Sequence, residues 1–233
     1  MALTPEAYLG ANPYPGRGVL IGRSACGKKS VIVYFIMGRS ENSRNRVFVR
    51  EGDDFRTRAF DPSKMVDPSL IIYYPLRVLG GDTIVTNGDQ TDTIYDFLKA
   101  GKSFEDALRT RTFEPDGPNF TPRISGVVRA DGSYSLSILK TEEGDEECTR
   151  RYFFDYTGEK PGRGHIIHTY SGDGSPLPSF AGEPVAIEIS GGCEQYARRV
   201  WESLNADNRV SLLSVFTDLE TGERESCVIN KHE

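Results

Sequence analysis

Three arginines and two asparagines gather in one short polar run, residues 38–46 (GRSENSRNR). The run follows residues 31–37, which have the apolar, β-branched and aromatic composition of a buried strand. A guanidinium is a rigid fork of donors that matches phosphate or carboxylate, and an amide offers both a donor and an acceptor to a purine edge. The run therefore either binds a nucleotide-like anion in a cleft or forms a solvated turn between strands.

A second polar cluster, residues 87–93 (NGDQTDT), joins a predicted strand over residues 84–86 to a predicted helix over residues 94–100. The free N–H groups of a first helical turn point toward such a connection and suit an anionic or polar ligand. The same threonines and aspartates could also do no more than cap the helix.

A third candidate is the loop of residues 114–123 (EPDGPNFTPR), in which three prolines restrict the backbone around two carboxylates, an asparagine and an arginine. This stiffness suits side chains that must be held in place for binding or catalysis. A simple long connection between two elements is the alternative interpretation.

The elements that position these clusters are mostly strands joined by glycine- and proline-rich turns. The pattern predicts about ten strands and three helices that lie between blocks of strands, which indicates an α+β fold with two stacked sheets and helices outside. No linker or low-complexity block divides the chain, so we expect residues 1–233 to form a single domain. The predicted strands include residues 19–22, 30–37, 47–49, 70–79, 84–86, 124–130, 134–139, 150–156, 164–170, 184–190, 210–216 and 224–229, and the predicted helices are residues 94–100, a second one starting at residue 103, and residues 193–206.

Composition excludes several classes of protein. The formal net charge of −6 argues against a general nucleic-acid binder, and no apolar run approaches the roughly 20 residues of a membrane span. The four cysteines show no C-x-x-C spacing, and His165 and His168 would point to opposite faces of a strand, so no metal site is expected. With no signal-like segment, we expect a cytoplasmic protein with reduced thiols.

Four short motifs in order resemble one known family: Y-L-G at residues 8–10, R-S…N-R at residues 39–46, T-N-G…T-D-T-I at residues 86–94 and T-P-R-I at residues 121–124. The sequence resembles the archaeal-type inosine monophosphate (IMP) cyclohydrolases and their bacterial relatives over roughly residues 8–215. That resemblance implies a four-layer αββα sandwich similar to N-terminal nucleophile hydrolases. It also implies closure of the purine ring of 5-formamidoimidazole-4-carboxamide ribotide to IMP with loss of water.

The resemblance further implies that Arg46, Tyr73 and Glu114 belong to the catalytic pocket. The reaction needs a carboxamide nitrogen held near a formyl carbon, stabilisation of charge on the formyl oxygen, and proton delivery to the departing water. An arginine suits the charge, and a tyrosine or a glutamate with a raised pKa suits the proton transfer. No step requires a metal or an organic cofactor.

We expect the phosphate on arginines and the uncharged part of the nucleotide on the junction at residues 87–93, because Asp92 would repel a phosphate but accept from a carboxamide or ribose hydroxyl. The predicted substrate-binding residues are Arg39, Arg44, Asn45, Asn87, Asp92, Thr93 and Arg123.

Two alternatives stay open at this stage: a purine-nucleotide-binding protein of the same fold without the activity, and a related amide or formamide hydrolase. Ala2 follows the initiating Met, so we do not expect hydrolysis through an N-terminal nucleophile. The oligomeric state, with a homo-oligomer possible, and the function of residues 165–183 are left open.

Overall fold

Two antiparallel sheets stack on each other in the computed structural model, which describes residues 2–65 and 67–232. The six-stranded sheet has the order β11-β10-β1-β2-β12-β13, and the seven-stranded sheet runs from β3 to β9 in chain order. The six-stranded sheet contains β1 (Arg17–Arg23), β2 (Lys29–Met37), β10 (Arg163–His168), β11 (Val185–Glu188), β12 (Arg209–Asp218) and β13 (Arg224–Asn230). The seven-stranded sheet contains β3 (Val47–Glu51), β4 (Asp54–Arg58), β5 (Leu76–Leu79), β6 (Asp82–Thr86), β7 (Arg123–Val128), β8 (Tyr134–Glu142) and β9 (Asp145–Tyr156).

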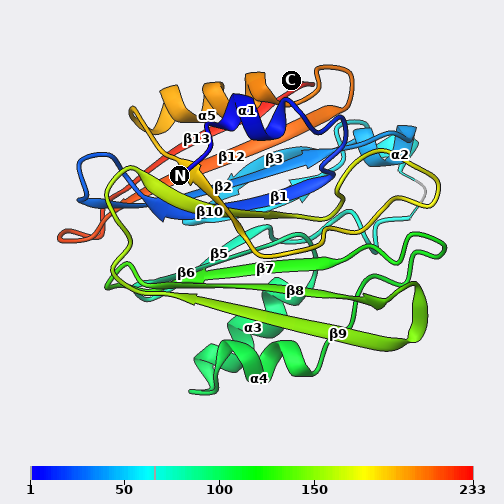
Figure 1. Cartoon of the computed structure of the whole chain (residues 1–233), viewed down its shortest axis with the longest axis horizontal. Coiled ribbons are helices and arrows are strands. Elements are labelled where there is room, and N and C mark those ends of the chain that lie inside the picture. The colour runs from blue at the N-terminus through cyan, green and yellow to red at the C-terminus, as the bar shows by residue number, and fades with distance from the viewer. Residues whose placement is uncertain (1, 66, 233) are drawn as a thin grey trace.

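Helices cover the outer faces of both sheets, so that the molecule has four layers (Figure 1). Helices α1 and α5 pack on the six-stranded sheet, and α3 and α4 pack on the seven-stranded sheet. This arrangement is the predicted α+β pair of stacked sheets. The helices are α1 (Pro5–Leu9), α2 (Glu41–Arg44), α3 (Gln90–Lys99), α4 (Phe104–Arg109) and α5 (Cys193–Ser203), with a 3-10 turn at Pro62–Lys64.

The apolar run of β2 follows from its place between two hydrophobic cores. Val33 and Phe35 pack in the core under α1 and α5, whereas Ile32, Tyr34 and Ile36 pack in the core between the sheets. Because successive side chains of a strand alternate between its faces, a strand covered on both sides needs apolar residues at every position.

The segment before β5 differs from the sequence prediction of a strand over residues 70–79. Only Leu76–Leu79 is extended, because the N–H groups of Ile71 and Ile72 both donate to the Pro68 carbonyl and turn the chain. Pro75 also lacks the N–H that a ladder needs. The prediction of this strand was therefore wrong over residues 70–75.

Three further elements lie where we predicted none. Strand β4 lies in the charged segment between the predicted strands of residues 47–49 and 70–79, and only Phe55 and Thr57 of its five residues are buried. Helix α1 lies before the first predicted strand, and Thr4 caps it by accepting from the Ala7 N–H. Helix α2 lies inside the polar run of residues 38–46.

The two histidines of β10 face opposite sides of their sheet, as their spacing predicts. His165 bonds to the Tyr134 hydroxyl of the opposing sheet at 2.7 Å, and His168 bonds to the Tyr8 hydroxyl of α1 at 2.7 Å. No helix among the described residues is long and apolar enough to cross a membrane.

Candidate active site

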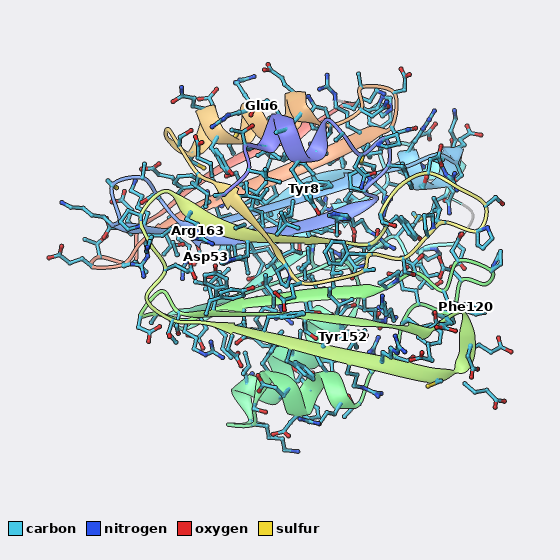
Figure 2. The ribbon with its side chains drawn as sticks, viewed as in Figure 1. Glu6, Tyr8, Asp53, Phe120, Tyr152 and Arg163 are labelled. Carbon is cyan, nitrogen blue, oxygen red and sulfur yellow. The ribbon has the colours of Figure 1, made fainter. Side chains whose placement is uncertain are left out.

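A cavity of about 290 Å³ opens at one end of the sandwich, where the polar run after β2 meets the loops before β7 and after β10. Figure 2 labels Phe120, in the loop before β7, at this end and Arg163, at the start of β10, at the opposite end. The cavity combines cationic, anionic and apolar side chains. Its lining includes Tyr14, Arg17, Arg39, Arg46, Leu70, Ile71, Glu114, Asp116, Thr121, Tyr170 and Leu177.

Helix α2 sets the direction of Arg46. Ser40 and Ser43 form a reciprocal capping box, in which the hydroxyl of each residue accepts from the backbone N–H of the other at 3.1 Å. The Ser43 carbonyl then accepts from Nε of Arg46 at 2.8 Å. In the described part of the chain, the Arg46 guanidinium makes no other hydrogen bond or ion pair, although the residue is only 4% exposed.

This buried, uncompensated cation faces the cavity. Burial lowers the pKa of Arg46, and the nearby Arg17 lowers it further. An arginine remains protonated despite such a shift. Its positive charge is therefore available to a negatively charged group in the cavity.

Arg17 and Glu114 form a buried ion pair with two parallel hydrogen bonds, of 3.0 Å and 2.9 Å. Burial alone would lower the pKa of Arg17, but the facing carboxylate raises it well above the ordinary value. Burial raises the pKa of Glu114, and Arg17 limits that rise. The pair satisfies both side chains and fixes the Glu114 carboxylate at the cavity wall.

The Asn87 junction lies behind this pair. The Asn87 carbonyl accepts from Arg17 at 3.2 Å, and its side-chain oxygen accepts from the Ile124 N–H at 2.9 Å. Gln90 accepts from Arg123 at 2.8 Å, and Asp89 forms an ion pair with Arg123 at 2.7 Å. The junction therefore holds β6, β7 and the Glu114 loop together.

Two buried tyrosines lie near Arg17 and Arg46. The hydroxyls of Tyr34 and Tyr73 are 2.7 Å apart, and both side chains are buried. Tyr73 is held by β4, since Thr57 accepts from its backbone N–H and donates to its carbonyl. Burial raises the pKa of Tyr34 well above its usual value, so its hydroxyl stays protonated.

Aromatic rings form the wall of the cavity near the Arg39 side chain. The Tyr14 ring stacks on Tyr170 with centroids 5.9 Å apart, and the Arg39 guanidinium lies 5.1 Å from the Tyr14 centroid. Arg39 also pairs with Asp173 and donates to the Gly174 carbonyl at 3.0 Å. Its side chain is 38% exposed, so a ligand can reach it from solvent.

Together these side chains are able to catalyse a reaction at an uncharged polar group of an anionic ligand. Arg46 can stabilise developing negative charge, Arg39 can bind an anion near solvent, and neighbouring hydroxyls and a buried carboxylate can carry protons.

A model of the family described as IMP cyclohydrolase-like protein matches residues 14–223. The chain belongs to this family.

Three relatives named IMP cyclohydrolase have similar levels of sequence identity to this chain. The IMP cyclohydrolase of Methanopyrus kandleri is 32% identical over 170 residues, which cover 71% of this chain and 79% of the relative. The enzyme of that name from Methanothrix thermoacetophila is 33% identical over 159 residues, covering 64% of this chain and 77% of the relative. One from Methanococcus maripaludis is 34% identical over 151 residues, covering 60% and 72%.

The structure brings together only part of the predicted site. Arg39, Arg46 and Glu114 line the cavity, whereas Tyr73 does not line it and is bonded to Tyr34. Asn87 and Arg123 are buried behind the Arg17–Glu114 pair.

The other four predicted residues lie elsewhere. Arg44 donates to Gly38 and Asn208, and Asn45 exchanges hydrogen bonds with the backbone of Asp61. Asp92 forms an ion pair with Arg77 at 2.8 Å, and Thr93 contacts Arg111 at 3.4 Å. None of the four lines the cavity, and their roles in substrate binding stay predictions.

Sequence reasoning missed Arg17, Tyr14 and Tyr170 as site residues, and it included Asp116 only as one of the two carboxylates of the candidate loop at residues 114–123. Arg17 had a readable signal, because it is a lone arginine between two glycines at the start of an apolar strand. Tyr170 and Tyr14 had none, since a tyrosine at the end of a strand is as common in an ordinary core.

Proposed function

We propose that this chain is an IMP cyclohydrolase, which closes the purine ring of 5-formamidoimidazole-4-carboxamide ribotide with loss of water. The observation that carries the proposal is the Arg46 guanidinium, buried at the cavity wall with no carboxylate partner among the described residues. Membership of the family and relatives named IMP cyclohydrolase support the same reaction.

The reaction begins when the carboxamide nitrogen attacks the formyl carbon, which forms a C–N bond and places negative charge on the formyl oxygen. Arg46 stabilises that charge. The formyl oxygen leaves as water after it gains two protons, one from the carboxamide nitrogen and one from the formamide nitrogen. We assign this proton transfer to Glu114 at the cavity wall, and Tyr73, whose hydroxyl is bonded to Tyr34 outside the lining, stays a sequence-based prediction for a second proton-transfer residue.

The ribotide phosphate binds near Arg39 in this proposal. Arg39 lies beside solvent, and Ser40 and Ser43, close to it in the chain, also line the cavity. Arg123 is less suited, because it is buried and does not line the cavity. We further propose that residues 1–233 form one cytoplasmic domain related in fold to the N-terminal nucleophile hydrolases, a relation supported by the stacked sheets and outer helices.

The test is to incubate the purified chain with the formylated ribotide and follow the appearance of IMP by chromatography. We expect IMP to form with stoichiometric consumption of the ribotide. Binding without turnover would instead favour a nucleotide-binding protein, and release of formate would favour a formamide hydrolase. Either result would contradict the proposed ring closure.

A further inference from the structure

Three side chains of the cavity wall form a continuous hydrogen-bonded chain. Asp116 accepts from the Thr121 backbone N–H at 2.6 Å and from the Thr121 hydroxyl. The Thr121 hydroxyl also contacts the Tyr170 hydroxyl. Thr121 and Tyr170 are buried, at 1% and 5% exposure, and all three residues line the cavity.

The direction of each hydrogen bond in this chain follows from the chemistry of its members. The Asp116 carboxylate has no hydrogen to donate, so the single hydroxyl hydrogen of Thr121 points to it. The Thr121 oxygen can then only accept from Tyr170, and the Tyr170 hydrogen is directed to Thr121. The Tyr170 oxygen therefore has lone pairs left but no hydrogen for a ligand.

Tyr170 is also held firmly in place. Its backbone carbonyl accepts from Nδ1 of His168 at 2.9 Å and from Asn12 at 3.2 Å, and its ring stacks on Tyr14. Burial raises the pKa of Tyr170 to about 12, so the hydroxyl keeps its hydrogen at neutral pH. A fixed ring with a fixed hydroxyl hydrogen presents the same acceptor to every ligand that enters.

We propose that the hydroxyl oxygen of Tyr170 accepts a hydrogen bond from the carboxamide N–H of the substrate. Asp116 and Thr121 hold this hydroxyl so that it can accept from a ligand but cannot donate to one. This inference rests on the proposed function for the identity of the ligand. The phosphate and the carbonyl oxygens of such a ribotide are acceptors, so only its N–H groups and hydroxyls can meet this oxygen. Contact with the N–H side of the carboxamide orients its nitrogen, rather than its oxygen, toward the formyl carbon.

Asp116→Asn tests the direction of the hydrogen bonds that join Asp116, Thr121 and Tyr170, and it changes the shape of the side chain very little. The asparagine oxygen can still accept from the Thr121 N–H, while its NH₂ group now donates to the Thr121 hydroxyl. Thr121 must then donate to Tyr170, and the Tyr170 hydrogen turns into the cavity. A ribose hydroxyl could adapt by reversing its own hydrogen bond, whereas a carboxamide NH₂ would meet a donor.

The experiment compares two ribotides that differ only in this group, by calorimetry: 5-aminoimidazole-4-carboxamide ribotide and 5-aminoimidazole ribotide. Neither has a formyl group, so neither can close a ring. We expect the wild-type chain to prefer the carboxamide ribotide, and both Asp116→Asn and Tyr170→Phe to reduce that preference by about tenfold. Asp131→Asn and Tyr74→Phe are matched controls outside the cavity and should leave the preference unchanged.

The other outcomes of these binding measurements separate a failure of this inference from a failure of the proposed function. Loss of the carboxamide preference in only one of the two variants would overturn this inference, because it requires both the Tyr170 hydroxyl and the direction of its hydrogen bond to Thr121. Equal weakening of both ribotides in both variants would indicate a ribose contact or a structural role and would overturn it as well. Wild-type binding of neither ribotide, in a chain that still forms IMP, would overturn this inference and leave the proposed function intact, whereas a carboxamide preference without ring closure would overturn only the proposed function.

Discussion

Arg46 and Arg17 are two buried arginines of one cavity with opposite surroundings. Arg17 is neutralised by the two hydrogen bonds of Glu114, whereas the charge of Arg46 meets only the Ser43 carbonyl among the described residues. A buried charge without a partner costs stability. Its presence is therefore best explained by a substrate that supplies the negative charge.

We expect Arg46→Ala to lower the rate of ring closure by about 10²–10³-fold, the usual cost of losing one donor to a developing oxyanion. Stability should stay the same or rise, because the variant removes a desolvated charge. Steady-state kinetics at saturating ribotide and urea unfolding measure the two effects. Arg198→Ala, an exposed arginine of α5, is the control; near-wild-type turnover of Arg46→Ala would exclude a catalytic role.

Arg17→Met should destabilise the fold by about 3–5 kcal/mol, because it leaves the Glu114 carboxylate buried without its cation. The double variant Arg17→Met/Glu114→Gln should recover much of this loss, since the second change removes the stranded charge. Urea unfolding of the wild type, both single variants and the double variant gives the coupling energy. Additive losses would mean that the pair contributes little as a pair.

At the scale of elements, the turn between β6 and α3 passes so close to the charged network that it needs a glycine. A Cβ atom at Gly88 would lie 2.7 Å from Nη1 of Arg123 and 2.7 Å from Oε1 of Gln90. It would also lie 3.4 Å from Oε1 of Glu114. The Asn87–Gly88 motif thus acts on the site through packing.

Gly88→Ala should therefore displace the Arg123 and Gln90 side chains and destabilise the protein by about 1–3 kcal/mol, as overpacking of a core does. Ring closure should slow as well, because Glu114 lies against the same atoms. Gly172→Ala is the matched control, since a Cβ there meets open space. Unchanged unfolding and kinetics in Gly88→Ala would show that the network has room to adjust.

At the scale of the whole molecule, the four layers bury two histidines of one strand on its two faces. Burial lowers the pKa of His165 and of His168 from 6.5 to about 4. Between these values the unfolded chain binds protons that the folded chain does not. The contribution of these two histidines to the free energy of unfolding is therefore fully present above about pH 6.5 and is lost as the pH falls toward 4.

We expect each histidine to add a slope of about 1.4 kcal/mol per pH unit to the free energy of unfolding in this window. Urea unfolding at several pH values from 4.5 to 7.5 measures it. The double variant His165→Gln/His168→Gln should show a flatter profile, with the shared contribution of the carboxylates still present. His232→Gln, at an exposed position, should not change the profile; an equally steep profile in the double variant would contradict the assignment.

The sequence by itself determined most strands, the α+β class and the family, because strand formation depends on local composition and alternation. It also indicated that residues 38–46 lie at a surface or line a cleft, because the run contains nothing that a core could take, and the family resemblance selected Arg46 within that run. Local signals failed at the charged strand β4, which is a strand because it pairs with β3 and β5 and buries Phe55 and Thr57. The turn before β5 did have local signals, Pro68 and Pro75, that the prediction of a strand over residues 70–79 passed over.

Only the tertiary structure decided which side chains meet. Arg17 and Glu114 are 97 residues apart, and Thr121 and Tyr170 are 49 residues apart. Arg44 and Arg46 are two residues apart, yet Arg46 lines the cavity and Arg44 does not. The direction of a loop side chain depends on how the sheets and helices around it pack, and no pattern of nearby residues contains that information.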